Sequence, residues 1–179
     1  MVLLSLSLAE CIQLISVIIA FATCSFLGIQ IWQKVRMSHA EQVAKMIDKI
    51  QYDPKLQNLF YDIEYNRFQY SSDFHGSDLE KTVDELLHHY EYVLYLQERG
   101  LLKKQEFLFF EYDIQRIVEN KNMQDYLFNL YHFVDWGSLS FKYQRLLSYG
   151  RNEGCISAEF DNPKSSYYKH VLRNACNTI

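Results

Sequence analysis

The hydrophobic and polar positions divide the chain into an apolar N-terminal stretch and a longer part with helical periodicity. From Cys11 to Trp32 no side chain is charged. A helix over these residues is about 33 Å long, enough to cross a hydrocarbon core of roughly 30 Å. After residue 33, charged residues are interspersed with apolar residues at helical spacing. This pattern predicts an all-α protein in which one N-terminal transmembrane helix precedes a helical bundle.

Two other interpretations of the apolar stretch fit less well. A cleavable signal peptide requires a positively charged start and a shorter apolar core. The first ten residues contain Glu10 and no Lys or Arg. A buried core helix rarely stays uncharged around its whole circumference over such a length. We therefore expect an uncleaved transmembrane helix over residues 11–33.

The flanking charges predict the orientation of this span. All 18 Lys and Arg residues lie C-terminal to Trp32. Cytoplasmic segments next to a span are enriched in these residues, so residues 33–179 are expected in the cytoplasm and residues 1–10 outside. The expected arrangement is a single-pass protein in a lipid bilayer.

Small residues recur every four positions within the span, at Ser16, Ala20, Cys24 and Gly28. This spacing places them on one face of a helix, where they allow two helices to approach closely. The face therefore predicts a homo-oligomer that associates through the span. The alternative is that small residues are simply common in membrane helices.

Beyond the span, the pattern predicts three regions. A juxtamembrane helix covers residues 34–52, either continuous with the span or restarting at Ser38. A helical bundle domain follows over residues 53–150, and residues 151–179 form a loop with a short helix. Asp53-Pro54 predicts the first helix start of the bundle, because Asp accepts backbone N–H bonds and Pro suits the first turn.

An αα-hairpin is the clearest prediction within the bundle. After an expected loop at residues 66–76, Ser77 and Glu80 form a capping box that starts a helix. Gly100 ends this helix in the left-handed conformation, and a second helix over residues 103–119 folds back on the first. The expected buried face of the first helix comprises Leu79, Val83, Leu86, Leu87, Tyr90, Val93, Leu94 and Gln97.

The remaining pattern predicts three further helices. Asn122 and Asp125 are expected to cap the first of them. Its apolar stripe comprises Met123, Leu127, Leu130, Tyr131 and Val134, and it ends at Trp136-Gly137. The next helix is expected to start at Ser138 or Ser140 and to run through Leu139, Leu146 and Leu147 to Gly150. After a loop at residues 151–164, a short helix from Ser165 is expected to bury Tyr168, Val171, Leu172 and Ala175.

Candidate chemistry is sparse. Glu85 and His88 have the spacing of a di-iron ligand pair, but no second such pair exists and both are expected to face away from the core. Cys155, Asp161 and His170 supply the groups of a nucleophilic triad without any local signature. No nucleotide-binding, metalloprotease or hydrolase motif occurs. We therefore expect no catalytic residues, no metal and no cofactor.

Charge and aromatic content limit the partners. The net charge is −4 and no basic block exceeds two residues, so a nucleic-acid partner is not expected. Surplus aromatic residues at Tyr92, Tyr95 and Phe109-Phe110 are candidates for a protein-binding surface. The four cysteines have no metal or disulfide spacing, so free thiols are expected at Cys11, Cys24, Cys155 and Cys176.

The hairpin region resembles a known family. The residues from Asp84 to Glu91 and from Leu96 to Leu102 are similar to those of an uncharacterised family of small bacterial membrane proteins. Its members have one N-terminal span and a helical cytoplasmic domain. The resemblance implies a bacterial inner (plasma) membrane and brings no catalytic residues.

Three functions are compatible with this pattern. The leading one is a non-enzymatic, single-pass protein that presents a helical interaction domain to an unknown cytoplasmic protein. The alternative is a membrane effector, of the toxin or phage-defence type, that acts by self-association of its span. The third is an enzyme with an unrecognised site.

Overall fold

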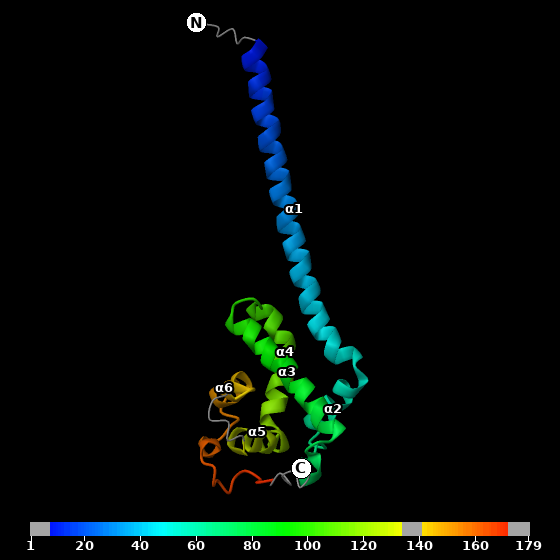
Figure 1. Ribbon diagram of the computed structural model, residues 1–179, viewed down its shortest axis with the longest axis vertical. Coiled ribbons are helices and arrows are strands. Elements are labelled where there is room, and N and C mark those ends of the chain that lie inside the picture. Colours follow the sequence, from blue (N-terminus) through cyan, green and yellow to red (C-terminus); the bar gives the residue numbers. More distant parts are fainter. Residues whose placement is uncertain (1–7, 134–140, 172–179) are drawn as a thin grey trace, which may run out of the picture. The chain divides into compact units, whose positions relative to one another are not determined.

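A computed structural model describes residues 8–133 and 141–171 of the chain (Figure 1). Within these residues the protein has six α-helices, two 3-10 helices and no strand, which confirms the predicted all-α class. The chain forms two compact units, Met1–Ala44 and Lys45–Ile179.

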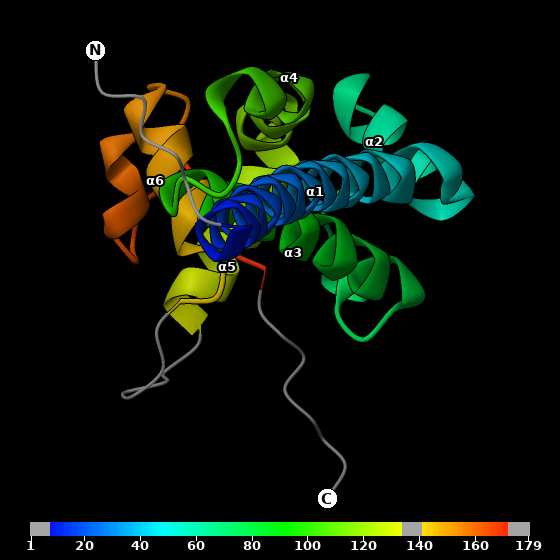
Figure 2. The same cartoon turned by 90° about the horizontal axis from the view of Figure 1, so that it is seen from above.

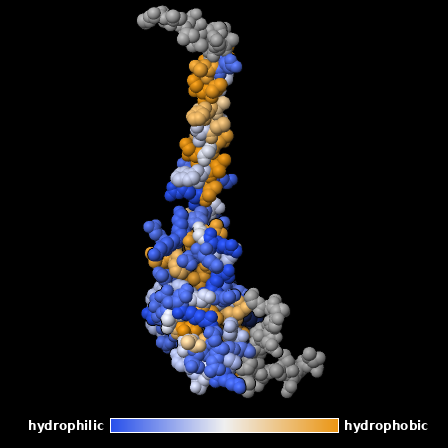
Figure 3. Space-filling model, turned by 90° about the vertical axis from the view of Figure 1, so that its left-hand side faces the viewer, coloured by the Kyte–Doolittle hydropathy of each residue, from blue (hydrophilic) through white to orange (hydrophobic). Residues whose placement is uncertain are grey.

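The first helix, α1, spans Leu8–Tyr52 and passes through Ser38 without a break. The predicted juxtamembrane helix is therefore continuous with the apolar stretch. Every residue from Ile12 to Ser38 is exposed, including the large apolar side chains of the stretch. No residue of the apolar window is buried, which argues against the core-helix interpretation, and Figure 3 shows much of this helix surface as hydrophobic. Within the described residues, α1 alone is long and apolar enough to cross a membrane.

The second unit is built on the predicted hairpin. Helices α3 (Asp78–Glu98) and α4 (Lys104–Glu119) lie side by side. Helix α2 (Pro54–Glu64) contacts both of them, and so does α6 (Gln144–Asn152). Helix α5 (Lys121–Phe133) packs against α4 (Figure 2). The hairpin is therefore the central element, with α2 and α6 on different sides of it.

Two of the predicted helix ends have the expected chemistry. The Asp53 carboxylate accepts the N–H groups of Lys55 and Leu56 and starts α2. Gly100 has a φ of 67°, and it ends α3 in a Schellman motif in which Gly100 and Leu101 donate to the carbonyls of Gln97 and Leu96.

One of the two hydrogen bonds of the capping box at α3 differs from the prediction. Ser77 Oγ accepts the N–H of Glu80 at 3.1 Å, as expected. The Glu80 carboxylate, however, accepts the N–H of Gly76 rather than that of Ser77. The N–H of Ser77 instead bonds to the Phe74 carbonyl, because the preceding 3-10 turn at Ser72–Phe74 places that carbonyl nearby.

The predicted buried face of α3 is correct in its centre and wrong at its ends. Leu79 is 44% exposed and Gln97 is exposed. His89 and Glu91 are buried although they lie outside the predicted stripe. The reason is that α2, α4 and α6 all contact α3, so its middle is covered on several sides and its ends are not.

The predicted loop at residues 66–76 is irregular but packed. It contains the 3-10 turn and buries the rings of Phe68, Tyr70 and Phe74. Phe74 contacts both Phe68 and Tyr70 edge to face. This segment therefore contributes to the core instead of lying on the surface.

Helix α5 departs most from its predicted stripe. Its start is capped by Asn120, whose Oδ1 accepts the N–H of Met123 at 3.1 Å, and not by Asn122. All residues from Met123 to Asn129 are buried, while Leu130 is half-buried and Tyr131 is exposed. The predicted positions Val134, Trp136, Gly137, Ser138, Leu139 and Ser140 lie outside the described residues.

The C-terminal part also corrects the prediction. Helix α6 starts at Gln144 and buries Leu146, Leu147 and Gly150. The expected loop at residues 151–164 contains a second 3-10 turn, Ala158–Asp161, which buries Phe160. The predicted helix from Ser165 is wrong up to Val171, since residues 165–171 have no helical structure. Tyr168 and Val171 are nevertheless buried, and Leu172, Ala175 and Cys176 lie outside the described residues.

Replacing Gly150 by Ala is expected to destabilise the second unit by about 1–2 kcal/mol, although Ala favours a helix. An added Cβ would lie 2.7 Å from Ile156 Cδ1 and 3.2 Å from Val118 Cβ. Chemical unfolding followed by circular dichroism measures the effect. The control is Ser148→Ala on the exposed side of the same helix, which is expected to change stability little. Equal stability of the two variants would contradict this packing.

The stability of the second unit is expected to fall as the pH is lowered from 6.5 to about 4. Burial, together with the nearby charge of Lys49, lowers the pKa of His89 to about 4. The unfolded chain then binds a proton that the folded chain excludes, which costs about 3 kcal/mol over this interval. The measurement is the free energy of unfolding against pH. In His89→Phe the corresponding part of the slope is expected to disappear; an unchanged slope would show that another group titrates.

Candidate functional site

The small residues of the span form an open surface. Ala20, Cys24 and Gly28 are exposed, and an added Cβ at Gly28 would meet nothing within 4 Å. The Ser16 hydroxyl donates to the Ile12 carbonyl of the same helix at 2.9 Å. The Ser16 hydroxyl therefore has a hydrogen-bond acceptor within its own helix. A second helix can approach this face without leaving that hydroxyl hydrogen unpaired.

The candidate ligand pair of α3 is not assembled into a metal site. Glu85 forms an ion pair with Lys49 at 3.0 Å, and the ring of His88 lies against Tyr143. Both residues face outward as predicted. Among the described residues, no three His, Cys, Asp or Glu side chains are grouped closely enough to hold a metal ion.

The candidate triad residues lie in separate contacts. Asp161 pairs with Arg151, and His170 Nε2 bonds to the Ser165 carbonyl at 2.7 Å. The Cys155 thiol faces the carbonyl of Glu153, and burial raises its pKa. A raised pKa lowers the fraction of nucleophilic thiolate, so this cysteine lacks the activation that a triad requires.

A different relay of polar groups occurs at the start of α3, where sequence reasoning expected only a cap. Glu80 Oε1 lies 3.0 Å from His75 Nδ1, and His75 Nε2 lies 2.8 Å from the Tyr70 hydroxyl. Tyr70 is 1% exposed, and its ring packs against Phe74 and Tyr126. Because the phenol is buried, the relay fastens the 66–76 segment to α3 and is closed to a substrate.

Buried tyrosines also pair with carboxylates. Tyr126 and Tyr143 both donate to Asp84 Oδ1, at 2.9 and 2.7 Å. Tyr90 donates to Asp113 at 2.8 Å, and burial raises the pKa of Asp113. These pairs cross-link α3 to α4, to α5 and to the segment before α6. Their role is structural.

The predicted aromatic surface is partly correct. Phe110 is buried, whereas Phe109 is 67% exposed. Leu108, Tyr112 and Leu101 are also exposed on or next to α4. We call these four exposed residues, Leu101, Leu108, Phe109 and Tyr112, the α4 face. Tyr92 and Tyr95 form a separate stacked pair on α3.

A shallow groove of about 470 Å³ lies between α3 and α6. Its walls include Leu94, Glu98, Arg145 and Tyr149. The Arg145 guanidinium is engaged by Glu98 at 2.7 Å and by Glu91 at 3.2 Å. Because the positive charge of Arg145 is already paired with these two carboxylates, the groove offers no unpaired positive charge to an anionic ligand.

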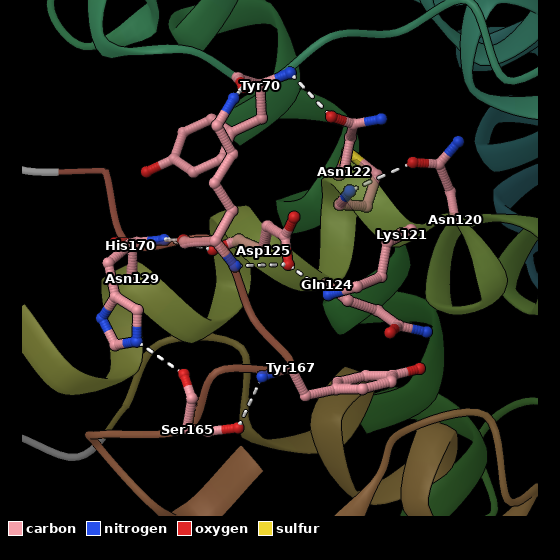
Figure 4. A network of polar contacts seen from close by, with 12 residues as sticks. Tyr70, Asn120, Lys121, Asn122, Gln124, Asp125, Asn129, Ser165, Tyr167 and His170 are labelled. Atoms are coloured by element: carbon pink, nitrogen blue, oxygen red, sulfur yellow. Dashed lines mark hydrogen bonds and ion pairs between the residues drawn. The ribbon is translucent and has the colours of Figure 1, made fainter. Parts of the chain in front are cut away.

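Buried polar residues of α5 and its cap form a further cluster that sequence reasoning missed. Asn120, Gln124, Asp125 and Asn129 are all less than 6% exposed. Asn120 Nδ2 donates to the Ile63 carbonyl at 2.8 Å, and Gln124 Nε2 donates to the carbonyls of Val118 and Cys155. Asp125 and Asn129 bind residues 165–171 (Figure 4). Their helical spacing is visible in the sequence, but polar residues at such spacing normally indicate a solvated face.

Comparison of the chain with protein families, with curated proteins and with solved structures finds no match. The resemblance to a family of bacterial membrane proteins, which covers roughly residues 11–150, therefore stays a prediction.

Cross-linking through Cys24 tests the small-residue face. In a variant in which Cys11, Cys155 and Cys176 are replaced by Ser, oxidation in lipid vesicles is expected to link two spans through Cys24, which is an exposed free thiol. Combining Ala20→Leu with Gly28→Leu is expected to reduce this product several-fold, because larger side chains keep the helices apart. The matched control combines Ile18→Leu with Ile29→Leu, on the opposite side of the helix. Equal reduction by both pairs would contradict association through this face.

Proposed function

We propose that the protein is a non-enzymatic, single-pass membrane protein that presents a helical interaction domain at the cytoplasmic side. The observation that supports the anchor is that the uncharged stretch of α1 is exposed on all sides of the helix. Phe21, Ile19 and Ile31 are each at least 60% exposed, and the apolar window of α1 has no buried residue. Each fully buried side chain of this size contributes about 1.5–3 kcal/mol, so a lipid environment stabilises the helix strongly.

The cytoplasmic orientation rests on charge. All Lys and Arg residues follow Trp32 in the sequence. The Arg36 guanidinium lies 4.7 Å from the centre of the Trp32 ring. An indole and a guanidinium together are favoured where the hydrocarbon meets the polar headgroups, and positive charge there favours the cytoplasmic side.

The α4 face supports the interaction role. Leu108 and Phe109 are both more than half exposed. On the face that Figure 3 shows, hydrophilic residues cover most of the second unit. Tyr112 beside them donates to Glu64, and the Arg116 guanidinium lies 5.1 Å from its ring centre. Apolar and aromatic side chains held by neighbours and surrounded by polar groups are typical of protein-binding surfaces.

A second candidate function follows from the open small-residue face of the span. A membrane effector would assemble through Ser16, Ala20, Cys24 and Gly28 and disturb the bilayer. Such an effector acts through the span, so its activity is expected to depend on Gly28 and not on the α4 face.

A photo-cross-linking amino acid at Phe109 tests the leading function in cells. The chain is expected to stay in the membrane after alkaline extraction, and illumination is expected to link it to a cytoplasmic protein. The same amino acid at Leu79, which is exposed on α3, is the matched control and is expected to give less of that product.

Three outcomes would contradict parts of this proposal. Extraction of the chain into the soluble fraction would contradict the anchor. Equal products at both positions would contradict a role of the α4 face. Depolarisation of the membrane on expression, lost in Gly28→Leu and retained in Phe109→Ser, would favour the effector.

A further inference from the structure

Residues 165–171, here called the strap, are bound to α5 through their backbone (Figure 4). The N–H of Lys169 donates to Asp125 Oδ1 at 3.1 Å. Asn129 uses both ends of its amide: Nδ2 donates to the Lys169 carbonyl at 2.6 Å, and Oδ1 accepts the N–H of Val171 at 3.0 Å. Two side chains of α5 thus satisfy three backbone groups of residues 169–171, which have no partner in a helix or strand.

Three side chains of the strap add anchors. Tyr168 is 2% exposed and stacks on Phe128 with ring centres 4.7 Å apart. Lys169 Nζ donates to the Tyr70 carbonyl at 2.8 Å. Val171 is 5% exposed. The bound segment therefore has an aromatic residue, a lysine directly after it and a β-branched aliphatic residue two positions later.

The surface that binds the strap belongs to other elements. Asp125, Phe128 and Asn129 lie on α5, Tyr70 lies in the 66–76 segment, and Phe160 lies in the second 3-10 turn. Asn129 Nδ2 also donates to the Asp125 carbonyl at 2.6 Å, which fixes its amide independently of the strap. Phe128 and Phe160 contact each other edge to face. Asn129 and Phe128 therefore have contacts within the rest of the second unit in addition to those with the strap.

We propose that this surface is a recognition site for a peptide segment of a partner protein, and that the strap is its tethered occupant. The bonds from α5 to the backbone of Lys169 and Val171 do not depend on side-chain identity, so the three anchors select an aromatic-Lys-x-Val type of segment. A partner segment of this chemistry replaces the strap bond for bond, and the strap is then released. The inference rests on the second unit alone and does not require the α4 face or the membrane anchor.

Tethering predicts how the site responds to a free peptide. A short tether gives the strap a local concentration in the millimolar range, so a peptide in solution competes poorly with it. Weakening the strap by Tyr168→Ser together with Val171→Ser is expected to raise the affinity for an added peptide at least about tenfold. The probe is a fluorescent, terminally blocked peptide with the sequence of residues 164–171, and the measurement is anisotropy with the full chain in detergent.

A modified peptide separates recognition from folding. Methylation of the Val171 nitrogen removes the N–H that Asn129 accepts and leaves the protein unchanged. This peptide is expected to bind at least about fivefold more weakly than the parent peptide, to the wild-type and to the strap-weakened chain alike. The comparison with wild-type protein remains valid even if the strap-weakened variant does not fold.

Several results would overturn the proposal. Equal binding of the methylated and parent peptides would show that Asn129 does not read the peptide backbone. Absence of binding to wild-type protein at millimolar peptide would show that the strap is a fixed part of the fold. A dimer whose formation depends on Asn129 and on an intact strap would show that a second copy, and not a partner protein, fills the site.

Discussion

Buried polar groups need hydrogen-bond partners, and this requirement determines how the irregular segments of the second unit are held. Glu91 lies inside the bundle and accepts the N–H groups of Arg145 and Leu146, so a side chain of α3 caps the start of α6. Asn120 binds the end of α2 through the Ile63 carbonyl and caps α5 at the same time. An unpaired group at any of these positions would cost about 1–3 kcal/mol. Side chains far away in the sequence therefore fix the start of α6 and the end of α2.

The polar groups of the span find their hydrogen-bond partners within their own helix. Its backbone groups bond within the helix, and the hydroxyls of Ser16 and Thr23 bond to carbonyls four residues earlier. No polar side-chain hydrogen of these two residues needs another element. A helix of this kind is suited to hydrocarbon, where water is absent and every polar group must be paired internally. The two hydroxyls of the span are thus satisfied locally, whereas buried polar groups of the second unit are satisfied by long-range contacts.

This difference explains what the sequence could predict. Local signals were correct: Asp53 starts α2, Gly100 turns the hairpin, and the apolar length identifies the candidate span. The polar residues of α5 were misread, because Asn122 was expected to cap the helix and instead accepts the N–H of Tyr70, 52 positions away. The strap was predicted as a helix from its apolar spacing. Its actual partners, Asp125 and Asn129, lie on an element that no local pattern connects to it.

The kind of contact that holds a segment also determines whether a segment of another protein could replace it. Tyrosine–carboxylate pairs such as Tyr90–Asp113 join two helices that also share an apolar interface, so exchange there would open the core. The strap contributes no helix and is held by two α5 side chains and three anchors. Its replacement by another segment leaves the hairpin, α2 and α6 in contact. Exchange at the strap requires its bonds to Asp125 and Asn129 to be made again and an aromatic and an aliphatic side chain to be buried again, but it does not require the interfaces among these helices to open.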